Sequence, residues 1–301
     1  MQIMRDIPLT YFYNWSPNPD KNTTAAMAEF AANGAENIMI CDDWACRLLT
    51  DPALWSKIYY NAMQCGVKLF EIHAPFGECY DLNTRLEYRR QAMIDEHIRL
   101  MQFAADVGCK TYVIHIGAWD CVCDHSVTLE SMRSRSLAAV EKLVAAAEKY
   151  KIVLAVENSF EMSNSPDEVL YILNRFDSPY IGCCFDVGHA NFMAPSPDGK
   201  PKNYTEHMLK RSWRGNLVQE PDALDKLLPH IVTTHLHDNN GVSDSHSLPG
   251  NGTVNWQEVM KKLNSAPRLL THQSEVSPFT QNQPLSIRKL CETMSELVKI
   301  C

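Results

Sequence analysis

Residues 231–246 read Ile-Val-Thr-Thr-His-Leu-His-Asp-Asn-Asn-Gly-Val-Ser-Asp-Ser-His, a short apolar and β-branched run that passes directly into polar side chains. Residues 231–234 are typical of a buried strand, and the Asn240-Gly241 pair marks a turn behind it. Five side chains that can bind a metal ion follow within a dozen residues: His235, His237, Asp238, Asp244 and His246. Imidazole and carboxylate ligands together suit zinc, manganese, iron or cobalt. The segment therefore predicts a strand that ends in a divalent-metal site.

Similar strand-like runs recur along the chain and alternate with helix-like segments. The predicted strands are residues 9–13, 37–41, 67–73, 111–115, 152–157, 180–186, 231–235 and 268–275. The predicted helices are residues 25–32, 51–66, 85–107, 126–150 and 284–300, with another that starts at residue 165. Nearly continuous apolar strands that alternate with helices are typical of a parallel sheet covered on both faces. Eight such units without a break in composition predict an α/β protein with one (βα)8 TIM barrel domain over residues 1–301.

Polar side chains occupy the carboxyl ends of these strands, which in such a barrel meet at one mouth. They are His73, His115, Glu157, Asp186 with His189 just beyond it, His235 with Asp244 and His246 in the loop that follows, and Glu275. One such residue alone is more often a hydrogen-bonded structural group, but packing does not explain the repetition. We expect Glu157, Asp186, His235 and Glu275 to bind the metal. The others are expected to be further ligands or substrate contacts, and His237 a partner of a ligand.

The composition is that of a globular protein with a substantial core, since 45% of the 301 residues are hydrophobic and 21% are charged. A formal net charge of −8 argues against a large electrostatic footprint for nucleic acid. Neither a signal peptide nor a transmembrane segment is expected from the apolar runs. The eleven cysteines are scattered and lack the spacing of zinc or redox pairs. We therefore expect a cytoplasmic protein with reduced thiols and no membrane partner; a homo-oligomer is compatible with these features.

Aromatic side chains follow the first four predicted strands, at Trp15, Trp44, Phe76 and Trp119. They are expected either to form an apolar wall on which the ring of a substrate, a sugar or an aryl group, rests or to plug the barrel mouth; Trp15 and Trp119 are the preferred substrate contacts. The loop after the sixth strand is long and carries Lys200, Lys202, Lys210, Arg211 and Arg214. Residues 191–215 are predicted to be either a lid that brings cations to an anionic substrate or a solvated segment with a proline-rich beginning.

Six short motifs, in a fixed order, give the chain a resemblance to a known superfamily. They are His-Ala-Pro-Phe (73–76), Ile-His-Ile-Gly (114–117), Val-Glu-Asn (156–158), Phe-Asp-Val-Gly-His-Ala-Asn (185–191), His-Leu-His-Asp-Asn (235–239) and Leu-Pro-Gly-Asn-Gly (248–252). The set resembles the xylose-isomerase-like TIM barrel superfamily over nearly the whole chain. That superfamily holds sugar and sugar-phosphate isomerases and epimerases, together with DNA repair nucleases of the endonuclease IV type. The resemblance is specific for the superfamily and leaves the reaction open.

For epimerase-like members, the resemblance implies one Mn, Co or Mg ion held by Glu157, Asp186, His235 and Glu275; zinc suits the same ligands. It also implies that Glu157 and Glu275 move the proton at the carbon beside the sugar carbonyl, because carboxylates on both sides of that carbon can serve as base and acid. His189 matches a position that contacts substrate there and is expected to be a catalytic residue beside Glu157 and Glu275. His73, His115 and His246 are expected to be substrate contacts. Ketose 3-epimerases carry an arginine in the loop where Asp244-Ser245-His246 stands here.

The first interpretation is therefore a metal-dependent isomerase or epimerase of a sugar or sugar phosphate that works through an enediolate. A lyase or dehydratase with the same metal site is the second, because elimination needs only a leaving group one carbon further on. The third is an endonuclease IV-like nuclease of abasic DNA. The nine ligands of its three-zinc site correspond to His73, His115, Glu157, Asp186, His189, His235, Asp244, His246 and Glu275. The acidic net charge and Glu78 in the loop after His73 weigh against DNA binding.

Overall fold

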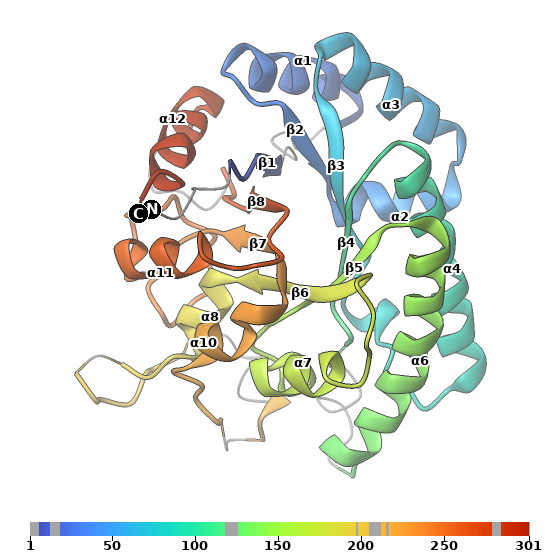
Figure 1. Cartoon of the computed structure of the whole chain (residues 1–301), viewed down its shortest axis with the longest axis vertical. Coiled ribbons are helices and arrows are strands. Elements are labelled where there is room, and N and C mark those ends of the chain that lie inside the picture. The colour runs from blue at the N-terminus through green and yellow to red at the C-terminus, as the bar shows by residue number, and fades with distance from the viewer. Residues whose placement is uncertain are drawn as a thin grey trace.

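The computed structural model describes residues 6–12, 19–117, 126–196, 198–204, 212–214, 217–278 and 284–300, and of residues 19–22 the backbone alone. Eight parallel strands pair in sequence order and close into a barrel (Figure 1), which confirms the predicted (βα)8 architecture. The strands are β1 (Leu9–Phe12), β2 (Asn37–Ile40), β3 (Lys68–His73), β4 (Thr111–Ile114), β5 (Val153–Glu157), β6 (Ile181–Asp186), β7 (Ile231–Leu236) and β8 (Thr271–Ser274).

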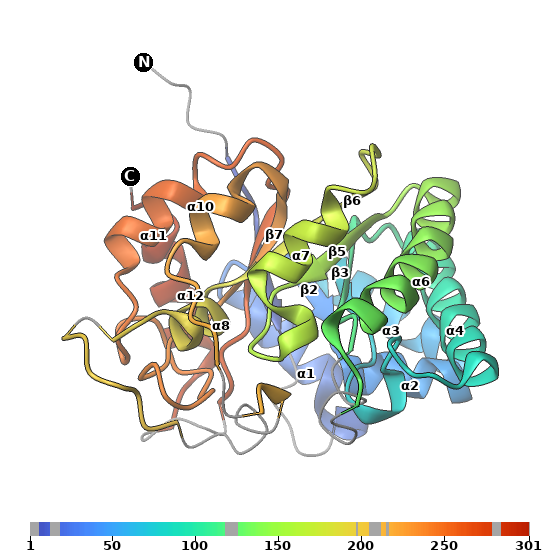
Figure 2. The same ribbon diagram turned by 90° about the horizontal axis from the view of Figure 1, so that it is seen from below.

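Helices surround the barrel on its outer side, as Figures 1 and 2 show from two directions. The α-helices are α1 (Pro19–Ala32), α2 (Asp42–Thr50), α3 (Ala53–Cys65), α4 (Glu87–Asp106), α6 (Leu129–Tyr150), α7 (Pro166–Leu173), α8 (Val187–Met193), α10 (Ala223–Leu227), α11 (Trp256–Leu263) and α12 (Ile287–Leu297). Short 3-10 turns are η1 (Glu78–Tyr80), η2 (Met162–Asn164) and η3 (Leu228–His230). Neighbouring helices pack in pairs, α1 with α3, α4 with α6 and α7 with α10. Within the described residues, no helix combines the length and apolarity needed to cross a membrane.

Small buried residues lie on the inner face of the barrel below the polar strand ends. Because strand side chains alternate between faces, Val113, Ala155 and Cys184 share a face with His115, Glu157 and Asp186, which follow two positions later. All three of these small residues are fully buried and pack together. They form an apolar part of the barrel interior beneath the mouth.

Several element boundaries differ from the prediction. Helix α1 begins at Pro19 instead of residue 25, and α4 and α6 begin at Glu87 and Leu129, later than predicted. The start of α6 follows from the cap at Thr128, whose hydroxyl accepts a hydrogen bond from the Ser131 backbone N–H in a capping box. The last strand is Thr271–Ser274, shorter than the predicted 268–275, so that Glu275 stands just beyond β8.

Helix α2 was not predicted, because it is short and follows β2 after a single residue. The sequence nevertheless contains its signals. Asp42 and Asp43 lie in its first turn, where negative charge complements the helix dipole. Trp44, Ala45 and Leu48 are buried on its inner side, at helical spacing. The helix therefore covers the barrel next to β3 and places Asp42 at the mouth.

His272 gives the fold a pH dependence that can be measured. Its ring is fully buried, with Nδ1 3.0 Å from Thr234 Oγ1 and Nε2 3.1 Å from Asn264 Oδ1. Burial lowers the pKa of His272 to about 3. The unfolded chain therefore binds a proton below its ordinary pKa of about 6.5 while the folded protein does not. Stability is unaffected by this group above that value and falls as the pH drops toward 3.

We expect wild-type stability to lose about 1.4 kcal/mol per pH unit from this residue between pH 6 and 4. A His272→Gln variant should be less stable at pH 7, but its free energy of unfolding should fall less steeply between pH 6 and 4. Urea unfolding at several pH values measures both slopes. His97, whose pKa burial lowers to about 3 as well, contributes equally in both proteins. Parallel stability curves for the two proteins would contradict the assignment.

Candidate metal centre

Glu157, the last residue of β5, is the hub of the barrel mouth. Four imidazoles surround its carboxylate. Oε2 lies 3.2 Å from His73 Nε2 and 3.1 Å from His115 Nε2. Oε1 lies 3.3 Å from His235 Nδ1 and 3.5 Å from His189 Nδ1. These residues come from four other strand ends or loops, so the closure of the barrel assembles them.

The electrostatics of the hub favour an ionised carboxylate. Burial alone would raise the pKa of Glu157, but His235 and His115 beside it hold that pKa well below its ordinary value. Burial and the same neighbour act on Glu275, whose pKa is also lowered, chiefly by His235. Conversely, burial would lower the pKa of His73, whereas its contact with Glu157 raises that pKa to about 8. The centre thus presents anionic oxygens to anything that enters it.

Glu157, Asp186, His235 and Glu275 come together as one candidate ligand set, with one donor atom of each within 4.8 Å of all the others. The register explains part of this, because Asp186 on β6 is paired with His235 on β7. His235 Nδ1 lies 3.2 Å from Glu275 Oε2 and 3.7 Å from Asp186 Oδ2. It is buried and forms no hydrogen bond of standard geometry within the described residues. Three carboxylates and an orphaned imidazole nitrogen are a donor set that fits a divalent cation.

A second, overlapping set shares two of these residues. One donor atom each of His73, Glu157 and His235 also lie within 4.8 Å of one another. His115 adjoins this set through Glu157, and its ring lies 5.3 Å from that of His73, centroid to centroid. The Glu157 carboxylate therefore has Oε2 beside His73 and His115, and Oε1 beside His235, which belongs to both sets.

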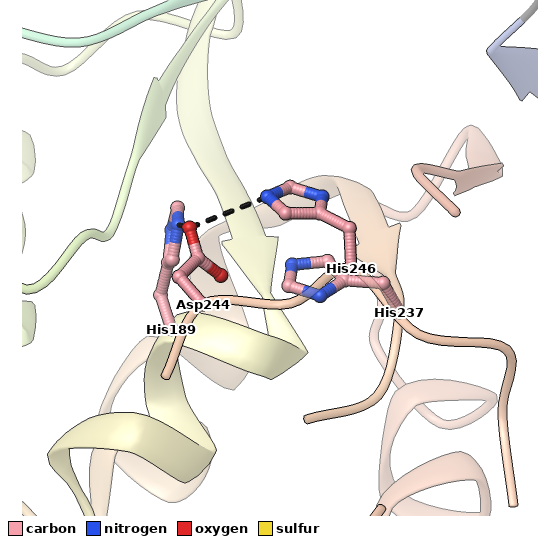
Figure 3. A group of neighbouring side chains, drawn as sticks. All are labelled: His189, His237, Asp244 and His246. Carbon is pink, nitrogen blue, oxygen red and sulfur yellow. Dashed lines mark hydrogen bonds and ion pairs between the residues drawn. The ribbon is translucent and has the colours of Figure 1, made fainter. Parts of the chain in front are cut away.

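A third set lies beside the first and is drawn in Figure 3: His189, His237, Asp244 and His246. Asp244 Oδ2 is 3.4 Å from His189 Nε2 and 3.3 Å from His246 Nε2. The His237 and His246 rings lie against each other (Figure 3), stacked with their centroids 3.9 Å apart. Burial would lower the pKa of His246, but Asp244 raises it to about 9. The nine sequence-predicted side chains therefore all lie at this mouth.

His189 owes its place to the start of α8. The Asp186 side chain accepts a hydrogen bond from the His189 backbone N–H at 2.6 Å and so caps the helix. The His189 ring then points back to the Asn158 carbonyl, 3.0 Å from Nδ1. Close packing is required here, because a Cβ on Gly188 would lie 2.0 Å from the His237 ring. His246 is fixed with a positive φ of 43°, a conformation that is strained for a non-glycine residue and typical of functional sites.

Asp238 is a loop anchor and belongs to none of these sets, although the sequence offers it as a ligand. Its two carboxylate oxygens are filled by four donors: the backbone N–H groups of Asn239, Gly250 and Val254, and the Trp256 indole N–H. A Cβ on Gly252 would lie 2.2 Å from this carboxylate, so only glycine fits there. Asp238 thus folds the segment that carries Asp244 and His246 back against the barrel.

Two further polar groups at the centre were not predicted. Asp42, at the start of α2, lies close enough to His73 and Glu275 to interact electrostatically with both, and burial raises its pKa. Glu71, on β3, is fully buried 3.8 Å from the His235 ring. Asp42 could have been found as a carboxylate that directly follows a strand. Strand alternation places Glu71 on the same face as His73, but its contact with His235 appears only when the barrel closes.

Of the aromatic candidates, Phe76 lies at the mouth. Its side chain is 47% exposed, and its ring stacks on His115 with centroids 4.9 Å apart. Trp44 is only 2% exposed within α2, so it cannot form an open wall. Trp15 and Trp119 lie outside the described residues. Of the two aromatic candidates that the structure describes, Phe76 is therefore the one that a molecule bound at the mouth can touch.

The described cations of residues 191–215 have protein partners. Lys202 Nζ donates to the carbonyls of Asn191 and Phe192 at 2.8 and 3.2 Å, at the end of α8. Lys200 pairs with Asp198 at 2.8 Å on the surface, and Arg214 donates to the Val127 carbonyl. Lys210 and Arg211 lie outside the described residues. Lys202 therefore ties this segment to the helix that carries His189, and the prediction of a cationic lid stays a prediction.

Comparisons with known proteins agree with this architecture. A family model described as Xylose isomerase-like TIM barrel matches residues 27–270. An uncharacterized protein of Methanocaldococcus jannaschii is 28% identical over 198 residues, 64% of this chain and only 59% of that protein's length. A D-tagatose 3-epimerase-like protein is 20% identical, covers 98% of both chains and has a TM-score of 0.69. The IOLI protein with a binding zinc atom is 16% identical over 97% of this chain and 98% of its own, with the same TM-score.

Proposed function

The chain belongs to the xylose isomerase-like TIM barrel family, and on that premise we propose that it is a divalent-metal-dependent isomerase or epimerase of a small sugar or sugar phosphate. The observation that carries the proposal is the convergence of Glu157, Asp186, His235 and Glu275 on one point. The 3-epimerase-like and zinc-binding structures of the same fold support it. Manganese, cobalt, magnesium and zinc all accept such oxygen and imidazole ligands.

The proposed chemistry is proton transfer at a carbon next to a carbonyl. A bound divalent cation would supply the positive charge that stabilises an enediolate. Glu157 and Glu275 are the proposed base and acid. The lowered pKa values of both carboxyls keep them ionised before substrate binds, as the base requires. The carboxyl that acts as the acid must take up a proton before it donates one. His189, His73, His115 and His246 line the same mouth and are proposed to hold the substrate hydroxyls. Phe76 offers an apolar face to the sugar carbons.

A panel of ketoses, their phosphates and sugar acids tests this proposal. The purified protein is loaded with Mn²⁺, Co²⁺, Mg²⁺ or Zn²⁺ in turn and incubated with each compound, and the products are identified by NMR. Formation of an epimer or aldose–ketose isomer with one metal, and its loss after chelation, is the expected result. A dehydrated product would replace the isomerase with the lyase. Conversion that is insensitive to chelation would contradict both.

One observation favours a second candidate, an abasic-site nuclease with three zinc ions. The first two sets overlap at Glu157 and His235. The third adjoins them, because His189 Nδ1 lies 3.5 Å from Glu157 Oε1 and His237 Nε2 lies 3.1 Å from Asp186 Oδ2. The net charge of −8 opposes this reading, because DNA affinity depends on neutralising phosphates.

Substitution of Asp244 separates the two candidates. For a sugar enzyme with one ion, an Asp244→Asn variant should retain one metal per chain, because Asp244 would face substrate, and its KM should rise by roughly tenfold, the equivalent of one lost charged hydrogen bond. For the nuclease, the same variant should lose zinc. Elemental analysis after exhaustive dialysis measures the stoichiometry, and Asp222→Asn, which changes an exposed acid outside the three ligand sets, is the matched control. Three zinc ions per chain in the wild type and two in the Asp244→Asn variant would contradict a sugar enzyme with one metal ion.

A further inference from the structure

Glu71 is a buried carboxylate inside the barrel with no assigned role. It lies on β3 two residues before His73 and is fully buried. The Thr111 hydroxyl donates a hydrogen bond of 2.6 Å to Oε2. Oε1 has no hydrogen-bond partner of standard geometry within the described residues. A buried carboxylate with one oxygen that lacks a hydrogen bond destabilises the fold, so its presence in the barrel indicates a functional role.

The group that Oε1 faces is the imidazole of His235. Oε1 lies 3.8 Å from His235 Nε2. On the opposite side of the ring, Nδ1 lies 3.3 Å from Glu157 Oε1 and 3.2 Å from Glu275 Oε2. The ring is fully buried. His235 is therefore held between the candidate ligand set and Glu71, one nitrogen turned to each.

This arrangement fixes which nitrogen carries the proton once a cation is bound. A neutral imidazole has one N–H, and the nitrogen that binds a metal must be the other one. With Nδ1 turned to the ligand set, the proton belongs on Nε2, where the Glu71 carboxylate can accept it. Partners of this kind fix the orientation of a metal-binding histidine and make it a stronger donor, and their loss typically costs about 10–100-fold in metal affinity.

We propose that Glu71 is a positioning residue that accepts the His235 Nε2–H, presents Nδ1 to the divalent cation and so raises the affinity of the centre. Thr111 orients Glu71 by occupying its other oxygen. The proposal rests on the metal site of the proposed function and adds to it a carboxylate outside the ligand set. It holds whichever sugar the enzyme uses.

Another polar group beside the ring, outside the ligand set, is the Cys184 thiol, which also interacts with His235. Cys184 is paired with Thr233 across β6 and β7 and is fully buried. A thiol is a weak hydrogen-bonding group, so Glu71 is expected to dominate. A Cys184→Ala variant distinguishes the two partners.

The first test measures the dissociation constant of Mn²⁺ and Zn²⁺ by calorimetric titration of the metal-free proteins. We expect Glu71→Met to weaken binding by about 10–100-fold, and Glu71→Gln, which keeps an acceptor oxygen but loses the charge, to weaken it less. Cys184→Ala should change the constant by less than threefold. Equal affinities of wild type and both Glu71 variants would overturn the proposal, as would a loss confined to Cys184→Ala. A wild type that binds neither ion would instead refute the metal-dependent function.

The second test separates positioning from a merely structural role. Because Glu71→Met removes a half-satisfied buried carboxylate, the metal-free variant should unfold at the same temperature as the wild type or higher. A structural role predicts a lower midpoint with unchanged metal affinity. Should the Met variant fail to fold, Thr111→Val leaves Glu71 in place but unanchored and is expected to weaken metal binding severalfold; unchanged binding in that variant would then overturn the proposal.

The third readout is spectroscopic. In the zinc-loaded protein, ¹⁵N-labelled histidine should show a His235 Nε2–H proton that exchanges slowly with water and resonates downfield, assigned by its absence in His235→Gln. In Glu71→Gln this proton should move upfield, and in Glu71→Met it should exchange faster. An identical signal in the wild type, Glu71→Gln and Glu71→Met would show that Glu71 accepts no hydrogen bond from His235.

Discussion

A Glu157→Gln variant is expected to lose about a thousandfold or more in kcat with the sugar substrate while it remains folded. Proton transfer by a positioned carboxylate contributes about 10²–10⁴-fold, and Glu157 is also a proposed ligand. The amide of the introduced glutamine cannot accept the substrate proton. It also lacks the negative charge of the Glu157 carboxylate, which four imidazoles surround. Rates of the metal-loaded variant are compared with wild type at saturating substrate, and circular dichroism checks the fold.

The matched control is Glu168→Gln. Glu168 is also buried, but on α7, where it forms an ion pair of 2.5 Å with Arg133. This variant should lose stability and keep its kcat. If Glu157→Gln retained more than about a tenth of the wild-type kcat, Glu157 would not be the base or acid of the reaction.

Removal of the metal is expected to destabilise the protein strongly. Without a cation, the carboxylates of Glu157, Asp186 and Glu275 converge, and the positively charged partners that the described residues offer them are histidines. A ligand at a thousand times its dissociation constant stabilises the folded state by about 4 kcal/mol. For a protein of this size that corresponds to roughly 8 °C in the unfolding midpoint, at about 2 °C per kcal/mol. Calorimetric scans with Mn²⁺ and with EDTA measure the difference.

Asp186→Asn identifies the site of this effect. The asparagine can still cap α8 through its side-chain oxygen, so the metal-free fold should be nearly as stable as that of the wild type. The shift caused by Mn²⁺ should, however, fall to a small fraction. An exposed acid, Asp167, provides the control, since Asp167→Asn should keep the full shift. A shift that survives in Asp186→Asn would place the stabilising ion elsewhere.

The barrel could be predicted from the sequence because its strands are nearly continuous apolar runs that end in polar residues. Once eight such strands close in order, His73 and Glu275 must meet although 200 residues separate them. The roles of the nine side chains at the mouth stay predictions, as do the single domain and the cytoplasmic location. Helix α2 escaped prediction because nine residues carry too short a periodic signal.

The finer partition of the site depends on tertiary contacts that no local pattern encodes. Asp238 and Asp244 are the same residue type in the same loop. Asp238 accepts hydrogen bonds from four donors and so holds the loop together, whereas Asp244 lies between two histidines. Glu71 meets His235 from β3 across the barrel interior, so only the closed sheet reveals the pair. Sequence spacing identifies the residues that can act, and packing decides which of them do.

The most direct measurement of the central claim is solvent exchange. The metal-loaded enzyme is incubated in D₂O with the sugar that it converts best, and the product is analysed by NMR and mass spectrometry. Proton transfer beside a carbonyl, with Glu157 and Glu275 as base and acid, predicts deuterium at that one carbon of the product and no deuterium after chelation. Product formed at the full rate without any deuterium from solvent would contradict this account.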